Sequence, residues 1–373
     1  MIELDPKGQL SRREWLAVGA AIGTSLATYG LAPDAVAQPN GIRARLSLNE
    51  NPFGPSTFAV TAIRDELSQL ERYTADRGKD LETQIAALEG VSADQIILGE
   101  ILDALGLQLA LTGPKGGEFI YSEPGYTALV DAVAPGGGTA VGVPLNDRQE
   151  NNLPALAAKI RGQTRALYLV NPHNPSGTVS ATTAFKDFVR AAAKRTLVIV
   201  DEAYLEFLPD FTERTMVSLT RAGENVIVFR TFGKIYGLAG LAIGYAIAPK
   251  SLAASLKAKG LGSTLELNRL AVVAASASLR DHKYIAKMRT LVGEERRKWN
   301  DLFARRNIRH ADATGNFVFF ETGQPHDHFA AALRAKGIDI GRSFLPLDSW
   351  ARISIGLPAE NNLARREVER LLS

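Results

Sequence analysis

The chain has 373 residues, enough for one large or two moderate domains, and its 46% hydrophobic and 22% charged residues are ordinary for a globular protein. The net charge of +3 is too small to indicate a nucleic-acid partner. Cysteine is absent, which excludes disulfides, thiolate metal sites and a cysteine nucleophile.

The first forty residues resemble an export signal. A twin arginine, Arg12-Arg13, precedes a mildly apolar stretch over residues 17–32 and a small-x-small cleavage pattern that ends at Ala37. The apolar stretch is short and weak for a membrane span, so stable membrane insertion is not expected. We therefore expect a twin-arginine signal peptide, recognised by the twin-arginine export machinery and cleaved near Ala37, and a periplasmic or secreted protein. An ordinary amphipathic helix is the alternative.

From about residue 60, the pattern alternates between helix and strand. Expected helices cover residues 81–88, 101–111 and 185–194, and expected strands cover residues 95–99, 118–122, 166–170, 196–200, 226–229 and 241–248. Three successive glycines predict a flexible turn over residues 134–143. Continuous apolar strands that alternate with helices predict an α/β fold, with a mainly parallel sheet covered on both faces.

A second, smaller domain is expected near the C-terminus. Gly260 and Gly262 lead into a long helical region over residues 267–306, and apolar runs at 316–320 and 351–355 precede an amphipathic helix at 362–372. The predicted division is a signal peptide (1–37), an N-terminal arm (38–55), a large cofactor-binding domain (56–255) and a small α+β domain (256–373).

Polar residues follow the predicted strands, where ligands of parallel sheets bind. Asp201 closes one apolar strand, and Lys234, 33 residues later, follows the next. An acid and an amine in these places can hold the two ends of pyridoxal phosphate. Lys234 would form a Schiff base with the aldehyde, and Asp201 would keep the ring nitrogen protonated, so that the ring can absorb carbanion charge. Most of the functional interpretation depends on this pair.

Two neighbouring motifs fit the same ring. Two prolines and a glycine make residues 171–178 a rigid turn, which can hold Asn174 so that its amide donates to the phenolic oxygen of the cofactor. After Asp201, Ala203 is small enough to lie beneath the ring, and Tyr204 can reach the same oxygen. Taken singly, a bare turn and a helix-capping aspartate explain these motifs equally well.

Together the motifs resemble those of fold-type I pyridoxal-phosphate-dependent aminotransferases of class I/II, most closely the histidinol-phosphate aminotransferase branch. The resemblance implies the pyridoxal-phosphate-dependent transferase fold and a homodimer. The matching segments, in the family's order, are Leu48–Gly54, Arg72-Tyr73, Pro124–Tyr126, Asn171–Thr178, Asp201–Tyr204, Val226–Leu241 and Arg352–Gly356.

The resemblance also implies roles for single residues. Lys234 would move the substrate proton, Tyr126 would stack on the ring, and Tyr73 would reach the cofactor phosphate of the partner subunit. Arg352 would clamp the substrate carboxylate through two hydrogen bonds, with Asn49 and Arg342 on the substrate side. Backbone N–H groups at a helix start would hold the phosphate, those of Gly99, Glu100 and Ile101.

Three departures from the family pattern concern phosphate groups. Gly233 stands where the family has serine, and Ala242 where it has arginine, which leaves the helix start, Thr231 and the partner's tyrosine to hold the cofactor phosphate. Strand alternation points Arg230 away from the side of Thr231. We therefore hypothesise that the cofactor is bound more loosely, or that another basic residue holds its phosphate. The family's tyrosine near the substrate phosphate has no counterpart upstream of Asn49, which weighs against histidinol phosphate as the substrate.

The sequence thus predicts an aminotransferase that moves an amino group between an amino acid, or an amine like histidinol phosphate, and a 2-oxo acid. A pyridoxal-phosphate lyase, racemase or oxidase is the nearest alternative, and a binding protein of the same fold with reduced catalysis is another. No metal site is expected, because His326 and His328 have no further ligands nearby and are typical of a solvated loop. His173 is expected to be packed inside its turn.

Overall fold

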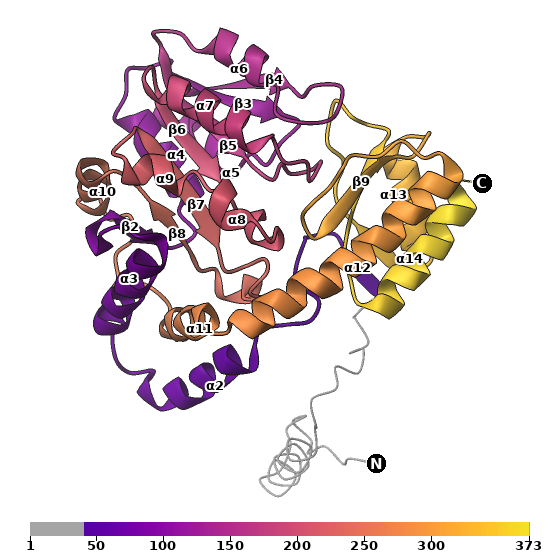
Figure 1. Cartoon of the computed structure of the whole chain (residues 1–373), viewed down its shortest axis with the longest axis horizontal. Helices are drawn as coiled ribbons and strands as arrows, with labels where there is room; N and C mark the ends of the chain where they lie inside the picture. The colour runs from indigo at the N-terminus through magenta and orange to yellow at the C-terminus, as the bar shows by residue number, and fades with distance from the viewer. Residues whose placement is uncertain (1–40, 373) are drawn as a thin grey trace, which may run out of the picture. The chain divides into compact units, whose positions relative to one another are not determined.

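The central element of the protein is a seven-stranded sheet with the order β2-β8-β7-β6-β5-β3-β4 (Figure 1). The computed structural model describes residues 41–372, so the predicted signal peptide lies outside the described residues. Every neighbouring pair is parallel except the two that include β8, which confirms the mainly parallel sheet. The strands are β2 (Ile96–Leu98), β3 (Glu118–Glu123), β4 (Thr139–Pro144), β5 (Thr164–Val170), β6 (Leu197–Asp201), β7 (Val226–Thr231) and β8 (Gly244–Ile247).

Both faces of this sheet are packed, as the unbroken apolar strands predict. Along β6, Val198 belongs to one core cluster and Ile199 to another, because successive side chains of a strand point to opposite faces. Phe185 from α7 joins the first cluster and Leu105 from α4 the second. The helices of this part are α2 (Thr57–Glu66), α3 (Ala75–Glu89), α4 (Leu102–Leu111), α5 (Ala128–Asp131), α6 (Leu153–Lys159), α7 (Thr182–Ala193), α8 (Phe211–Arg214), α9 (Val217–Arg221) and α10 (Lys250–Lys257).

The C-terminal part contains two small sheets. β9 (Phe317–Glu321) pairs antiparallel with β11 (Trp350–Ser354), while β10 (Ile338–Ile340) pairs parallel with β1 (Ala44–Leu46) from the beginning of the described chain. Its helices are α12 (His282–Arg306), α13 (His326–Arg334) and α14 (Pro358–Leu371), whereas α11 (Arg269–Leu279) packs against α2 and α3. The described residues from Ile42 onward form one compact unit, and the expected boundary at residue 255 stays a prediction.

The structure corrects three expectations about single elements. Residues 139–144 do not form part of a flexible turn but the edge strand β4, whose weak apolar signal reflects its partly exposed position. The strand expected from residue 241 begins at Gly244, because Ala242 has a left-handed backbone with a φ of 47°. The segment from His326 to His328 is not a solvated loop, since it begins α13 and His326 is buried against the carbonyl of Gly341.

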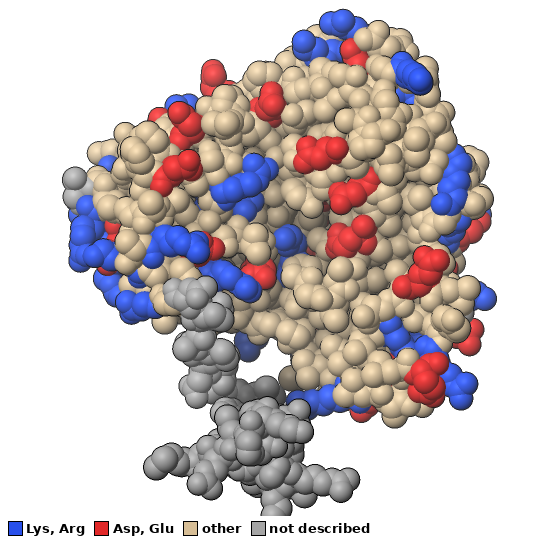
Figure 2. All heavy atoms as spheres, turned by 180° about the vertical axis from the view of Figure 1, so that it is seen from behind, with Lys and Arg blue, Asp and Glu red and all other residues tan. Residues whose placement is uncertain are grey.

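The helical region over residues 267–306 is divided into α11 and α12. Asp281 begins the second helix by accepting a hydrogen bond from the backbone N–H of Tyr284, as an N-cap does. Within residues 41–372, no helix is both long and apolar enough to cross a membrane. Basic and acidic side chains are interspersed over the face in Figure 2, in keeping with the small net charge.

Candidate active site

A cavity of about 650 Å³ lies at the carboxyl ends of β6 and β7 and extends to the C-terminal part of the chain. The structure brings most of the predicted site residues into this one cavity. Tyr73 is not among them, because its side chain is 83% exposed on the surface, and Gly99 and Ile101 lie beside the cavity without lining it. The predicted residues that line it are Asn49, Glu100, Tyr126, Asn174, Asp201, Tyr204, Thr231, Lys234, Arg342 and Arg352.

Lys234 lies in the tight loop that follows β7. Its Nζ donates to the carbonyl of Leu48 at 3.2 Å and lies 5.8 Å from the ring centroid of Tyr204. The loop packs closely on the N-terminal arm at Gly237, which has a φ of +73° and whose Cβ, if present, would lie 2.5 Å from the carbonyl oxygen of Gly54. Only glycine fits there, because it tolerates both the conformation and the contact. The amine is thereby held at the cavity wall.

Asp201 ends β6 and is buried. Its carboxylate accepts hydrogen bonds from the backbone N–H of Ala203 and from the hydroxyl of Tyr168, both at 3.0 Å. Burial raises the pKa of Asp201 to about 7, against the lowering effect of these two hydrogen bonds and of Lys234. A protonated pyridine nitrogen beside this carboxylate would supply the positive charge that its surroundings lack. The arrangement therefore fits the nitrogen end of the cofactor ring.

Two amides converge on the hydroxyl of Tyr204. Asn174 donates to it at 3.3 Å, and Asn49 donates to it at 3.1 Å. The turn holds Asn174 in place through the hydrogen bond from the N–H of His173 to the carbonyl of Thr178, and His173 is buried as expected. These groups fit the phenolic oxygen of the ring. Whether they bind it stays a prediction.

Arg352 extends from β11 into the same cavity. Its guanidinium donates to Oδ1 of Asn174 at 2.6 Å and to the carbonyl of Ser47 at 2.7 Å, while its Nε has no hydrogen-bond partner within the described part of the chain. Burial lowers the pKa of Arg352 to about 10, so the group remains a cation at neutral pH. A buried guanidinium with an unused donor is suited to a carboxylate, which it can bind through two parallel hydrogen bonds.

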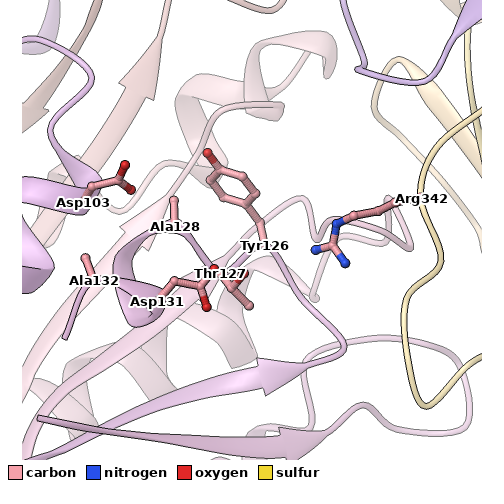
Figure 3. A pocket seen from close by; sticks show the side chains of 7 residues that line it. All are labelled: Asp103, Tyr126, Thr127, Ala128, Asp131, Ala132 and Arg342. Carbon is pink, nitrogen blue, oxygen red and sulfur yellow. Dashed lines mark hydrogen bonds between the residues drawn. The ribbon is translucent and has the colours of Figure 1, made fainter. Parts of the chain in front are cut away.

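A second hollow, of about 720 Å³, adjoins the cavity and shares Tyr126 and Arg342 with it. In Figure 3, Tyr126 lies between Arg342 and the carboxylates of Asp103 and Asp131. The guanidinium of Arg342 lies 4.5 Å from the ring centroid of Phe344.

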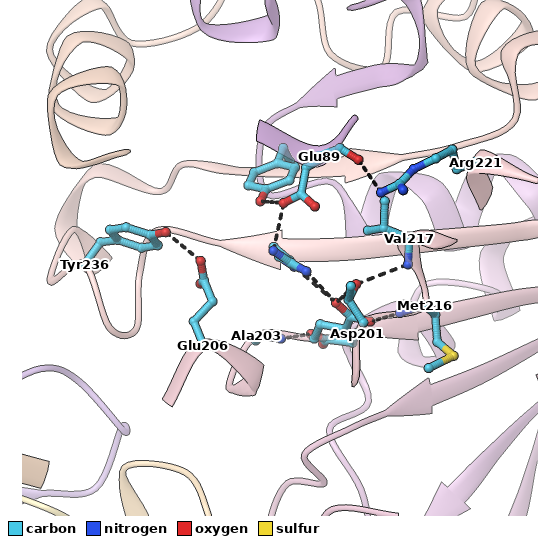
Figure 4. Close-up of polar contacts among 12 residues, drawn as sticks. Glu89, Asp201, Ala203, Glu206, Met216, Val217, Arg221 and Tyr236 are labelled. Atoms are coloured by element: carbon cyan, nitrogen blue, oxygen red, sulfur yellow. Dashed lines mark hydrogen bonds and ion pairs between the residues drawn. The ribbon is translucent and has the colours of Figure 1, made fainter. Parts of the chain in front are cut away.

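A buried network of charged groups lies near the end of β6 that carries Asp201 (Figure 4). Arg230 is 2% exposed and pairs with Glu89 at 2.8 Å and with Glu202 at 3.0 Å. The pairing confirms that Arg230 points away from the side of Thr231. Arg230 therefore does not replace the missing phosphate ligands, and it instead ties together the strand ends that carry Asp201 and Thr231.

Sequence reasoning missed three contributors to the site. The hydroxyl of Tyr168 in an otherwise apolar strand was a usable signal, because a buried phenol needs a hydrogen-bond partner. The carbonyl of Ser47 and the ring of Phe344 had no such signal, since both serve Arg352 only through the tertiary fold.

The chain belongs to the family described as aminotransferase class I and II, which it matches over residues 43–366. It is 34% identical over 349 residues to histidinol-phosphate aminotransferase 2 of Ralstonia nicotianae, covering 91% of this chain and 92% of the relative. It is 33% identical over 324 residues to the histidinol-phosphate aminotransferase of Limosilactobacillus fermentum, covering 85% and 88%.

Among solved structures, the chain is similar to histidinol-phosphate aminotransferase from Sinorhizobium meliloti in complex with pyridoxal 5'-phosphate. The TM-score is 0.81 at 30% identity, with 93% of this chain and 96% of that chain covered. The family and the ring-binding groups together define a pyridoxal-phosphate-dependent aminotransferase. Lys234, Asp201, Asn174 and Tyr204 would hold the cofactor ring.

Proposed function

We propose that the protein transfers an amino group between an α-amino acid, or an amine resembling histidinol phosphate, and a 2-oxo acid. The observation that carries this proposal is the shared cavity. The cavity is lined by the amine of Lys234, the buried carboxylate of Asp201 and the guanidinium of Arg352. The Nε–H of Arg352 has no hydrogen-bond partner among the described residues.

Each of these groups has a distinct chemical task. When bound, pyridoxal phosphate supplies an electron sink for charge that develops at the α-carbon of the substrate. Lys234 would accept the α-proton on Nζ as a general base and would later return a proton as a general acid. Asp201 would stabilise the protonated form of the ring nitrogen by pairing with it. Arg352 fixes the substrate carboxylate, so that the α-proton faces Nζ.

A requirement for a 2-oxo acid tests the reaction class. Amino donors, including histidinol phosphate, are to be screened with 2-oxoglutarate or pyruvate as acceptor. We expect sustained turnover only when donor and acceptor are both present, because the second half-reaction regenerates the starting cofactor. Sustained product formation without any 2-oxo acid would instead indicate a lyase, racemase or oxidase.

The substrate itself is the open part of this proposal. The similar proteins named histidinol-phosphate aminotransferase support an amine of that kind. The absence of the family's tyrosine upstream of Asn49 supports a different amino acid. The donor with the highest kcat/KM in the screen decides between them.

We also propose that the functional unit is a homodimer. Tyr73 and Leu70 are 83% and 58% exposed, and Phe58 on the nearby helix α2 is 52% exposed, which supports a surface that a second copy covers. Mixing Lys234→Ala with Tyr73→Ala chains tests the exchange of Tyr73. If each subunit supplies Tyr73 to the other, the mixed dimer regains one complete site and its activity exceeds that of both variants. Activity no higher than the variants' own contradicts this.

Export is proposed from the sequence alone, since Arg12 and Arg13 lie outside the described residues. Replacing both with lysine should keep the chain in the cytoplasm with an uncleaved N-terminus, as measured by fractionation and mass spectrometry. Unchanged export of the variant would refute twin-arginine transport.

A further inference from the structure

The geometry of the ring determines where the phosphate of the cofactor must lie. In pyridoxal phosphate, the phenolic oxygen and the phosphate-bearing carbon flank the aldehyde on opposite sides. With the nitrogen at Asp201, the aldehyde at Lys234 and the phenolic oxygen near Tyr204, the phosphate points away from Tyr204. Among the lining residues, Thr231 is joined by hydrogen bonds to Glu100 and Gly233, and these groups would face the phosphate together with Ala242.

This end of the cavity contains a carboxylate where an anion has to bind. Glu100 lies between β2 and the start of α4, and its Oε1 accepts a hydrogen bond from the hydroxyl of Thr231. That hydroxyl in turn accepts the N–H of Gly233 at 2.9 Å. A hydroxyl has a single proton, so Thr231 has none left for a phosphate while Glu100 is ionised.

The positive charges of the cavity compensate for this carboxylate only in part. Its lining cations, within residues 41–372, are Lys234, Arg352 and Arg342. Lys234 is the lining cation whose charge acts on Glu100. The guanidinium of Arg352, on β11, instead donates to Asn174 and to the carbonyl of Ser47. What remains for the phosphate is the set of N–H groups at the start of α4, next to Glu100 itself.

We propose that Glu100 controls the affinity of the site for the cofactor phosphate. As a carboxylate, Glu100 repels the phosphate and retains the hydrogen bond from the hydroxyl of Thr231. As a carboxylic acid, Glu100 donates a hydrogen bond to the phosphate. Binding of the phosphorylated cofactor then takes up a proton from water. The affinity of the site for the cofactor phosphate should therefore fall as the pH rises, because Glu100 loses its proton. We call this pH-dependent control by Glu100 a gate, and it lies in a place where the family has permanent phosphate ligands. This proposal depends on pyridoxal phosphate being the cofactor.

The charges around Glu100 are compatible with proton uptake. Burial of the carboxylate raises the pKa of Glu100. The hydrogen bond from Thr231 and the charge of Lys234 offset part of this rise, and the charge of Asp103 adds to the rise. Asp201 on β6 also lies within electrostatic range. A phosphate placed beside Glu100 adds negative charge and excludes water, and both effects favour the protonated form further.

The test compares two ligands, pyridoxal phosphate and pyridoxal, which differ only in the phosphate. Dissociation constants are measured by absorbance titration of the cofactor-free full chain between pH 6 and 9, for wild type, Glu100→Gln, Glu100→Ser and Asp103→Asn. We expect Glu100→Gln to bind pyridoxal phosphate on the order of tenfold more tightly at pH 8, because an amide cannot ionise and can donate. Its affinity for pyridoxal should stay within about twofold.

The pH dependence gives a second readout. In wild type, the ratio of the dissociation constant of pyridoxal phosphate to that of pyridoxal should rise with pH, and it should be nearly constant in both Glu100 variants. Asp103→Asn is the matched control, because it removes an exposed carboxylate from the same helix start and leaves Glu100 in place. Because Asp103 adds to the rise in the pKa of Glu100, the variant should move the curve to slightly lower pH and still show the rise of the ratio with pH.

Specific outcomes overturn the proposal. If Glu100→Gln and Glu100→Ser, verified as folded by circular dichroism, leave the ratio and its slope unchanged, Glu100 does not act on the phosphate, although the cofactor assignment stands. If Asp103→Asn has the same effect as Glu100→Gln, the response comes from general charge and not from a gate. If neither ligand binds to any variant, the cofactor assignment fails together with the inference.

Discussion

We expect the buried carboxylate of Asp201 to stabilise the cofactor-free protein less at alkaline than at acidic pH. In the folded chain, burial raises the pKa of Asp201 to about 7, from 3.8 for the free side chain. The folded state therefore holds its proton more tightly than the unfolded state does between these values. By linkage, this stabilisation is complete below pH 3.8 and is lost as the pH rises through 7.

The magnitude follows from the size of the pKa shift. One pKa unit corresponds to about 1.4 kcal/mol, so a shift of about three units costs the folded state about 4 kcal/mol once Asp201 is ionised. About 1.5 kcal/mol of this is already lost at pH 5, which leaves about 2.5 kcal/mol between pH 5 and pH 8. Asp201→Asn removes the titration but keeps an acceptor for the N–H of Ala203. We therefore compare the free energy of unfolding of Asp201→Asn with that of wild type at each pH. The variant's advantage over wild type should be about 2.5 kcal/mol larger at pH 8 than at pH 5.

Urea unfolding of cofactor-free wild type and Asp201→Asn, followed by circular dichroism at both pH values, measures this difference. Other titrating groups are shared by the two chains and cancel in the comparison. Asp103→Asn, which removes an exposed carboxylate, should show no such difference. With pyridoxal phosphate bound, the order should reverse, because only the carboxylate can pair with the protonated ring nitrogen. Equal pH dependence of the two cofactor-free chains would show that burial does not govern this group.

Three further substitutions test the site and its support. Lys234→Ala should abolish turnover and the visible absorbance band of the bound cofactor, and a fully active variant would end the assignment. Arg352→Lys should raise KM for the 2-oxo acid by on the order of a hundredfold, because lysine cannot form two parallel hydrogen bonds, and an unchanged KM would place the carboxylate elsewhere. Arg230→Met should lower the free energy of unfolding by about 3–5 kcal/mol, since Glu89 and Glu202 would remain buried without their cation, and denaturant unfolding that matches wild type would contradict this.

The pattern of apolar runs was sufficient to predict the sheet and the edge at which the site lies. Lys234 and Asp201 follow neighbouring parallel strands, and the carboxyl ends of such strands meet at one edge wherever the intervening helices pack. Asn174 could be placed beside them for the same reason. Arg230 could be assigned to the opposite face by strand alternation alone, and the structure agrees.

Only the tertiary structure decided which distant side chains meet within that edge. Glu100 was expected to offer its backbone N–H to a phosphate, yet its carboxylate faces the cavity and binds the hydroxyl of Thr231. The hydrogen bond of Tyr168 with Asp201 and the edge strand β4 were likewise visible only in the tertiary structure. Local sequence determines the period of an element and the side to which a residue points. The partners of a buried polar group depend on the packing of segments far apart in the chain, which no local pattern contains.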